Sequence, residues 1–399
     1  MQGIDLLRGL CIVAVVLHHI NLRVRLDKTS LGAVMGTAAS RILFWSGYNG
    51  VIVFFVISGF LITTWSIRRW GTLAQISRRQ FYLMRFARIV PCLLGLLAIL
   101  SIFDRLGVPR FVIDTHRSSL PRALLAALTF HINWLEARTG YLPASWDVLW
   151  SLSIEEVFYI FFPLVCALLR KQALIIAFLC CFLIIGPWAR VHTQNQYWAD
   201  NGYLSCMDGI ALGCLAAIAA TKFRPGKRTR LALGIFGALL CIFIDVFRTA
   251  AFRTGLYKVG LDITTLELGA ALLLIALQLG FNSQGGPKSL DTKTSSRIGS
   301  AVRAQLSFSL AGWFRWFGRN SYEIYLTHMF VIWPSVFLFQ RSGLTINAAP
   351  GLFVITTVLA GLLGWTVARF YSEPCNRWLR YKLVQGRDAG KEIAAGSTA

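Results

Sequence analysis

Long apolar runs, separated by shorter polar segments, dominate this sequence. A helix needs roughly 20 apolar residues, with a tolerance of about 17 to 25, to cross the hydrocarbon core of a bilayer. Runs near this length predict membrane-spanning helices, and the shorter runs are expected to extend into their flanks. The candidate spans are 4–21, 50–66, 89–103, 121–135, 151–168, 172–187, 207–221, 229–247, 261–279, 321–339 and 350–370.

The composition supports an integral membrane protein. Of the 399 residues, 56% are hydrophobic and only 15% are charged, whereas a soluble protein carries about 25% charged residues. Lysine and arginine number 40, against 18 acidic residues. Because these bases lie between apolar spans, retention at the cytoplasmic face explains them better than nucleic-acid binding does. We therefore expect a bilayer, and no nucleic acid, as the partner of this surface.

The positions of the bases predict the topology. The bases that form clusters between the spans and in the tail can all share one side of the membrane only if 121–135, which begins with Pro121 and Arg122, does not cross; the other bases fall on the outer side. This interpretation gives an all-α polytopic membrane protein with about ten transmembrane helices, both termini cytoplasmic, and a re-entrant or interfacial helix at 121–135. The alternative, in which 121–135 crosses and 207–221 does not, balances the charges equally well. We favour the first because 121–135 is the more polar segment.

The sequence also predicts the domain bounds and the role of the cysteines. Polar residues interrupt the first apolar run, which predicts a retained span and not a cleaved signal peptide. We expect a membrane domain over 1–380, a mobile loop at 281–304 and a disordered cytoplasmic tail at 381–399. The cysteines lie mostly in apolar segments and form no Cys-x-x-Cys motif, so we interpret them as packing residues and expect no metal site.

The first predicted span carries Asp5, Arg8, His18 and His19. Arg8 and His19 are eleven positions apart, so on a helix they fall within about 20° of one another and about 16 Å apart along the axis. Such side chains are costly in a membrane helix unless they face a protein interior or a wet cavity. The pattern therefore predicts an intramembrane polar site.

A second polar motif is WSLSIEEVFYIFFP, residues 150–163, in which Glu155 and Tyr159 share one helix face. In the favoured topology, Glu155 and His19 both lie toward the outer side and are expected to meet. A carboxylate can fix the tautomer of a histidine and raise its basicity, which suits a general base acting on a hydroxyl. A buried ion pair that locks two helices without chemistry remains an equal alternative.

A third motif, RRQFYLMRFARIVP, places Arg85 and Arg88 on one helix face at the cytoplasmic mouth of a span. Guanidinium groups in this arrangement suit phosphate oxygens. The alternative is a helix whose arginines extend toward anionic lipid. His328, in SYEIYLTHMF, is a further polar residue within a span, for which a packing role is the simpler interpretation.

These motifs, with LRGLCIVAVVLHH, FFVISGFLIT and YSEPCNRW, together resemble the acyltransferase 3 family of integral membrane acyltransferases. The resemblance extends from Asp5 to about Trp378, with Leu6 at a usual glycine. It implies transfer of acetyl or another short acyl group from cytoplasmic acyl-CoA to a hydroxyl of a surface glycan, peptidoglycan or macrolide. It also implies the bacterial inner membrane. Some members carry a fused esterase-like domain; we expect any such relay to be a separate protein here.

The resemblance also implies roles for individual residues. His19 and Glu155 would be catalytic, and Arg8, Arg85 and Arg88 would hold acyl-CoA, a donor substrate and not a bound cofactor. The family's arginine–histidine motif corresponds to Arg8 and His19, and its R-x-x-R motif to Arg85 and Arg88. The supporting residues would be Asp5, Glu156, Tyr159 and His328, with Glu156 the weaker candidate for the acidic position.

The sequence leaves the acceptor and the acyl group open. The expected partners are acyl-CoA, the lipid bilayer and a saccharide, glycolipid or glycoside acceptor. Intramembrane arginine, histidine and glutamate also build substrate or proton pathways, so a transporter without acyl transfer is the alternative. A subunit whose polar helices serve assembly alone is a third hypothesis.

Overall fold

The computed structural model describes residues 2–223, 225–246, 255–282 and 310–385, with only the backbone considered at 279–282 and 384–385. Within these residues the chain is helical and contains no strand. The same part holds nine helices long and apolar enough to cross a membrane, or ten if one bent pair counts as a single span. The prediction of an all-α polytopic membrane protein is therefore confirmed. Most of the predicted loop at 281–304, and the tail beyond 385, lie outside the described residues.

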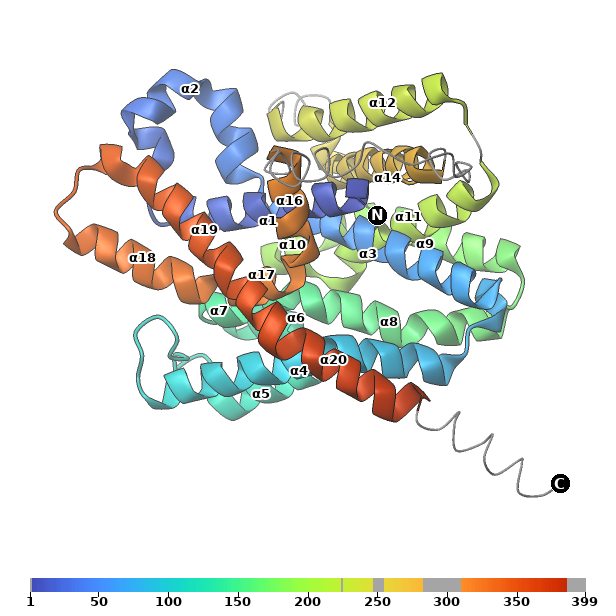
Figure 1. The fold of residues 1–399 in the computed structure, drawn as a ribbon, viewed down its shortest axis with the longest axis horizontal. Helices are drawn as coiled ribbons and strands as arrows, with labels where there is room; N and C mark the ends of the chain where they lie inside the picture. Colours follow the sequence, from blue (N-terminus) through green and yellow to red (C-terminus); the bar gives the residue numbers. More distant parts are fainter. Residues whose placement is uncertain (1, 224, 247–254, 283–309, 386–399) are drawn as a thin grey trace, which may run out of the picture.

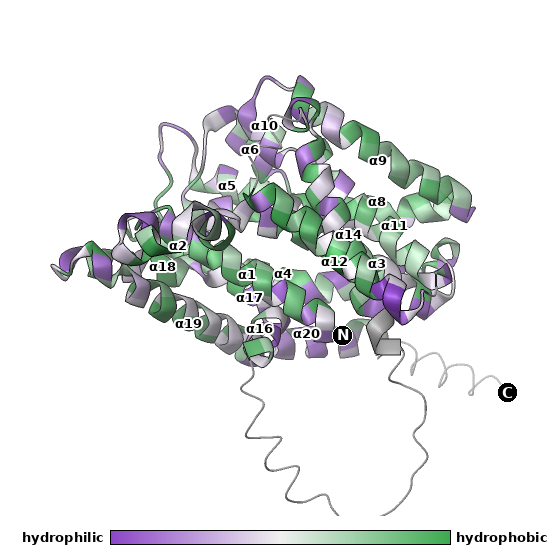
Figure 2. Ribbon diagram, turned by 90° about the horizontal axis from the view of Figure 1, so that it is seen from above, coloured by the Kyte–Doolittle hydropathy of each residue, from purple (hydrophilic) through white to green (hydrophobic). Residues whose placement is uncertain are grey.

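Most of the long helices extend beyond the apolar runs from which they were predicted, since their polar ends continue the helix. They are α1 (Gln2–Asn21), α3 (Gly47–Trp70), α4 (Arg78–Arg105), α8 (Leu149–Leu169), α9 (Gln172–His192), α11 (Tyr203–Lys222), α12 (Lys227–Val246), α14 (Leu261–Asn282), the bent pair α17 (Ser321–Thr327) and α18 (Met329–Arg341), and α19 (Ala349–Val367). The bend between α17 and α18 is 51°. Figure 2 shows hydrophobic residues along α8, α9 and α12 and hydrophilic residues gathered on α6 and α10.

Shorter helices connect and cover these spans. They are α2 (Ser30–Ser40), α5 (Leu120–Leu128), α6 (Ile132–Thr139), α7 (Ala144–Asp147), α10 (Gln196–Asn201), α16 (Leu310–Arg319) and α20 (Glu373–Arg380). Single turns of 3₁₀- or π-helix occur at Leu26–Lys28, Arg41–Trp45, Leu73–Gln75, Tyr257–Val259, Ile346–Ala348, Ala368–Ser372 and Tyr381–Gln385.

The segment 121–135 does not form one long helix. It is divided between α5 and α6, and Phe130 between them has a left-handed backbone with φ 57°. At 1.5 Å per residue, neither short helix is long enough to cross a bilayer. By contrast, α11 is long, apolar and largely enclosed by other helices. Of the two alternatives, this arrangement agrees with the one in which 207–221 crosses.

Two close helix crossings fix the core around α1 and α3 (Figure 1). Where α16 crosses α1, a Cβ atom at Gly9 would overlap the backbone oxygen of Phe314. Where α11 crosses α3, a Cβ atom at Gly59 would overlap the backbone oxygen of Ile210. Glycine is therefore required at both crossings for the backbones to approach, as is common for packing inside membranes.

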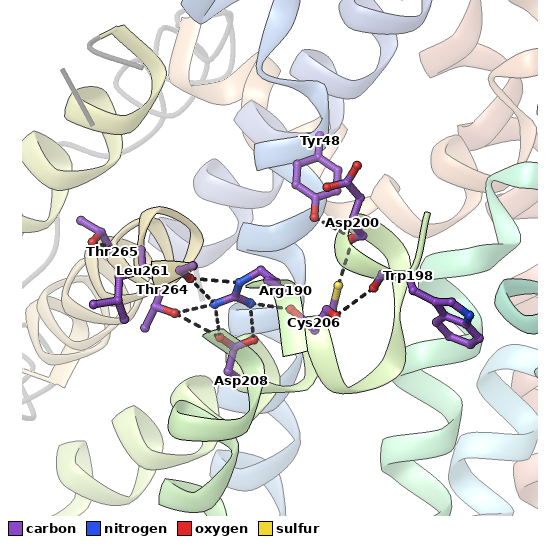
Figure 3. Close-up of polar contacts among 11 residues, drawn as sticks. Tyr48, Arg190, Trp198, Asp200, Cys206, Asp208, Leu261, Thr264 and Thr265 are labelled. Atoms are coloured by element: carbon purple, nitrogen blue, oxygen red, sulfur yellow. Dashed lines mark hydrogen bonds and ion pairs between the residues drawn. The ribbon is translucent and has the colours of Figure 1, made fainter. Parts of the chain in front are cut away.

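A buried ion pair ties α9, α11 and α14 together (Figure 3). Two nitrogens of Arg190 donate to the two carboxylate oxygens of Asp208, at 3.1 and 2.8 Å, and Arg190 also donates to the hydroxyl of Thr264 at 2.7 Å. The side chains of Arg190 and Asp208 are 7% and 0% exposed. Because the fork of the guanidinium is fully used, we assign this cluster to helix packing. Removal of one partner would leave a buried charge, at a cost of about 3 to 5 kcal/mol.

We predict that Gly59→Ala lowers the stability of the protein by about 1 to 3 kcal/mol, because the added methyl group forces α3 and α11 apart. Thermal unfolding of the detergent-purified protein measures this effect. Gly351→Ala, in α19, is the matched control, since a Cβ atom there meets nothing within 4 Å; in a helix it is expected to gain up to about 1 kcal/mol. Equal melting temperatures for the two variants would contradict the close crossing.

Candidate active site

A cavity of about 270 Å³ lies among α1, α3, α4, α8 and α17. It brings together four of the residues singled out from the sequence as site residues, together with Tyr159 from the supporting set. Its polar lining consists of Arg8, Ser58, Arg85, Arg88, Ser151, Glu155, Tyr159, Ser321, Tyr322 and Tyr325. Apolar side chains such as Phe54, Phe55 and Leu61 complete the wall. The arrangement is a polar chamber inside an apolar bundle.

Arg8 points into this chamber from α1. Its guanidinium donates to the hydroxyl of Ser321 at 2.8 Å. The charges of Arg88, Glu323 and Glu155 all act on it. An arginine in the first span is tolerated because it faces this cavity and not lipid. Asp5, one turn earlier, does not line the cavity; its backbone oxygen abuts Gly318 of α16.

The two arginines of the R-x-x-R motif have different partners. Arg88 lies 3.5 Å from the buried carboxylate of Glu323, which also accepts a hydrogen bond from Ser372 at 2.7 Å. The guanidinium of Arg85 lies 4.2 Å from the centre of the Tyr159 ring, and none of the ion pairs among the described residues includes it. Arg85 therefore keeps donors free for an anion, whereas Arg88 is partly neutralised.

Arg380 adds a further positive charge near Arg85 and Arg88. We call the end of the cavity at these arginines the arginine-lined mouth. Arg380 lies on α20, which packs against α4, and the charges that act on it most strongly are those of Arg88, Arg85 and Arg69. In the sequence Arg380 stands out only as one base of a basic segment, because no spacing rule links this segment to residues 69–88. The only signal was its positive charge.

Glu155 faces the same cavity from α8. The hydroxyl of Tyr159 donates to its carboxylate at 3.4 Å and also contacts the hydroxyl of Ser58. Glu156 behaves differently: it is buried, does not line the cavity, and leaves Oε1 without a hydrogen-bond partner. Of the two acidic residues in the motif, Glu155 is the one placed among the arginines.

His19 lies outside this cavity lining and packs against a second histidine. The centroids of the His19 and His328 rings are 5.1 Å apart with the rings perpendicular. The backbone oxygen of Tyr325 lies 2.7 Å from Nδ1 of His328, so that nitrogen carries the proton and Nε2 is left as an acceptor. Nε2 of His328 and Nδ1 of His19 are both buried without a hydrogen-bond partner. The pair therefore offers unused polar atoms to a ligand.

The expected contact between His19 and Glu155 is not formed, since no hydrogen bond or ion pair joins these two residues. Tyr325 lines the cavity together with Glu155 and also lies beside His328, the neighbour of His19. Its hydroxyl accepts a hydrogen bond from Ser151 at 2.8 Å in the cavity wall, and its ring centroid lies 6.0 Å from that of His328. The depth of two residues in a membrane can be inferred from sequence, but not the neighbours that each side chain faces.

Comparison with known proteins agrees with this architecture. A family model described as "Acyltransferase domain" matches residues 1–369. The peptidoglycan O-acetyltransferase OatA of Listeria monocytogenes is 24% identical over 83% of this chain and 49% of its own length. The O-acetyltransferase OatA of Staphylococcus aureus is 24% identical over 94% of this chain and 57% of its own length. The chain thus spans about half the length of these curated relatives, and no solved structure matches it.

The agreement covers the whole membrane bundle and includes the cavity, since every residue of its lining falls within the matched segment. The chain therefore belongs to the acyltransferase 3 family.

Proposed function

We propose that this protein transfers an acyl group, most simply acetyl, from cytoplasmic acyl-CoA to a hydroxyl of a glycan acceptor at the bacterial inner membrane. One observation carries the proposal: in an acyltransferase fold, three arginines and a glutamate line one chamber that ends beside a pair of histidines. The names of the relatives favour acetyl as the group and a peptidoglycan-like glycan as the acceptor.

The positive charge of the arginine-lined mouth suits the phosphates of CoA. Arg85 takes part in no ion pair among the described residues, although its charge acts on Glu155 and Glu156. The charges of Arg88 and Arg85 in turn act on Arg380. Phosphate oxygens accept strong charge-assisted hydrogen bonds from guanidinium groups. The cavity of about 270 Å³ is slightly smaller than the range of roughly 300 to 1,000 Å³ for pockets that enclose a drug-sized ligand. We therefore place the pantetheine arm inside it and the nucleotide at the mouth.

His19 would act as the general base. It would remove the proton of the acceptor hydroxyl while that oxygen attacks the thioester carbonyl. A carbon–oxygen bond then forms, the carbon–sulfur bond breaks, and the proton passes from His19 to the departing CoA sulfur. Tyr325 lines the chamber and lies beside His328, so we infer that its side chain moves aside for the thioester to reach the His19 ring.

Glu155 takes a different role from the one expected from the sequence. Because it contacts Tyr159 and not His19, we propose that it holds Tyr159 and the arginine cluster in place on the donor side. Cytoplasmic termini follow from the same assignment, since the arginine-lined mouth would face the compartment that contains acyl-CoA.

We predict that Arg85→Gln raises the KM for acetyl-CoA by about tenfold, because a charge-assisted phosphate contact is lost. Arg380→Gln should raise it by a smaller factor, with kcat unchanged. Release of CoA from acetyl-CoA by protein in nanodiscs provides the measurement. Arg377→Gln, on the same short helix, is the control. A KM that is unchanged in Arg85→Gln would show that this arginine does not hold the donor.

We predict that His19→Ala lowers acyl transfer by a factor on the order of 10² to 10⁴, the usual contribution of a general base. Mass spectrometry of the glycan, with CoA release in parallel, gives both products. His116→Ala, at an exposed position, controls for loss of a histidine. Wild-type turnover in His19→Ala would exclude this role, and glycan movement across liposomes without CoA release would favour a transporter.

A further inference from the structure

Two arginines from separate segments share one tryptophan at the end of the bundle opposite the arginine-lined mouth. Arg23 follows α1, and its guanidinium lies 4.1 Å from the centre of a Trp333 ring in α18. Arg110, in the loop between α4 and α5, lies 5.1 Å from the same residue. None of the ion pairs among the described residues includes either arginine. Two arginines outside any such ion pair thus contact one indole.

The loop that carries Arg110 is fixed in place. Its neighbour Phe111 is buried and stacks on Phe330 of α18, with ring centroids 5.3 Å apart and the rings nearly parallel. Trp333 lies one helical turn beyond Phe330, so this anchor sets Arg110 over the tryptophan. Arg110 has φ 74°, a left-handed backbone that is unfavourable for any residue with a side chain. The protein therefore maintains a strained backbone at the position that adds the second cation.

Nearby charges do not cancel this pair. Burial and repulsion from Arg110 together lower the pKa of Arg23 to about 10, while Asp147 opposes the shift. Asp147 also shares a side-chain hydrogen bond with Glu136, and it forms an ion pair with neither arginine. Neither arginine is therefore neutralised by a direct carboxylate contact among the described residues. An anionic ligand would supply the missing partner.

Unused polar atoms surround the pair and connect it with His19. Nε of Arg23, the indole nitrogen of Trp333 and Oδ1 of Asp147 are all buried without hydrogen-bond partners. Another nitrogen of Arg23 donates to the backbone oxygen of His19 at 2.5 Å. Buried polar atoms normally find partners, so this concentration indicates a polar ligand. That ligand would lie next to the histidine proposed as the general base.

We propose that Arg23 and Arg110 bind an anionic group, a carboxylate or a phosphate, carried by the acceptor beside the hydroxyl that is acylated. The inference rests on the proposed function, because it takes the ligand to be the acceptor. Asp147 and the Trp333 indole would bind neighbouring hydroxyl groups, one as acceptor and one as donor. The substrate class is thereby narrowed to acidic glycans, in which the charge belongs either to a sugar acid or to a phosphorylated sugar.

Binding measured without acetyl-CoA tests the subsite independently of turnover. The probes are a short oligogalacturonate, the neutral galactose oligomer of the same length, and a sugar phosphate, titrated by calorimetry into full-length protein in nanodiscs. An acidic probe is expected to bind in preference to the neutral oligomer. The two acidic probes distinguish carboxylate from phosphate. Equal affinity for charged and neutral probes, or no binding of either acidic probe at millimolar concentration, would overturn the proposal.

Variants of the loop make the test specific. Arg110→Asn removes the charge at a position where asparagine tolerates a left-handed backbone, and it is expected to weaken acidic-probe binding by about tenfold, as for a lost charge-assisted contact. Arg110→Lys should retain part of the affinity. Arg117→Asn, in the same loop but paired with Asp114 at 3.4 Å, should bind as the wild type does. An equal loss in the Arg110 and Arg117 variants would assign the effect to loop structure and refute a subsite.

Transfer assays then separate the two proposals. If His19→Ala binds the acidic probe normally but yields no acylated product, both proposals stand. If the acidic probe binds through Arg110 and no acceptor is acylated by the wild type, the subsite stands and the proposed function fails. If an acceptor is acylated and Arg110→Asn leaves its KM unchanged, the proposed function stands and the subsite fails.

Discussion

The cost of placing a charge in hydrocarbon determines where the polar chemistry of this protein can lie. Arg8, Glu155 and Glu323 belong to three different helices, and lipid would solvate none of them. Each must therefore face another helix or an internal cavity. The charged side chains converge because the surrounding lipid does not solvate them. The chamber among α1, α3, α4, α8 and α17 results from this exclusion. The close glycine crossings allow the helices to enclose it.

The same constraint explains what could be predicted from sequence. Apolar run length predicted the spans, and the density of polar residues in 121–135 distinguished it from 207–221 in agreement with the helix lengths. Arg8, Arg85, Arg88 and Glu155 were identifiable because charged residues inside or beside a span stand out from their neighbours. The structure places all four in one cavity, whereas the sequence had predicted that Glu155 would meet His19. Their catalytic and binding roles remain proposals.

What could not be predicted depends on helix rotation and on long-range packing. His19 and Glu155 were expected to meet because both lie toward one end of their helices, yet Glu155 faces the cavity and His19 packs against His328. Arg23, Arg110 and Trp333 are more than 80 positions apart in sequence, and the packing of Phe111 on Phe330 helps to hold the loop against α18. The Arg190–Asp208 pair, which spans two helices (Figure 3), was missed for the same reason.

The crossing of α3 and α11 has a consequence for the size of the chamber. Gly59, which forms that crossing, directly follows Ser58, which lines the chamber and contacts Tyr159. The width of the cavity at Ser58 therefore depends on how closely two backbones approach on the neighbouring face of α3. If the chamber holds the donor as proposed, a change in helix spacing alters the room for an acyl chain while every lining side chain is retained. In this fold, residues that limit the length of a substrate need not contact that substrate.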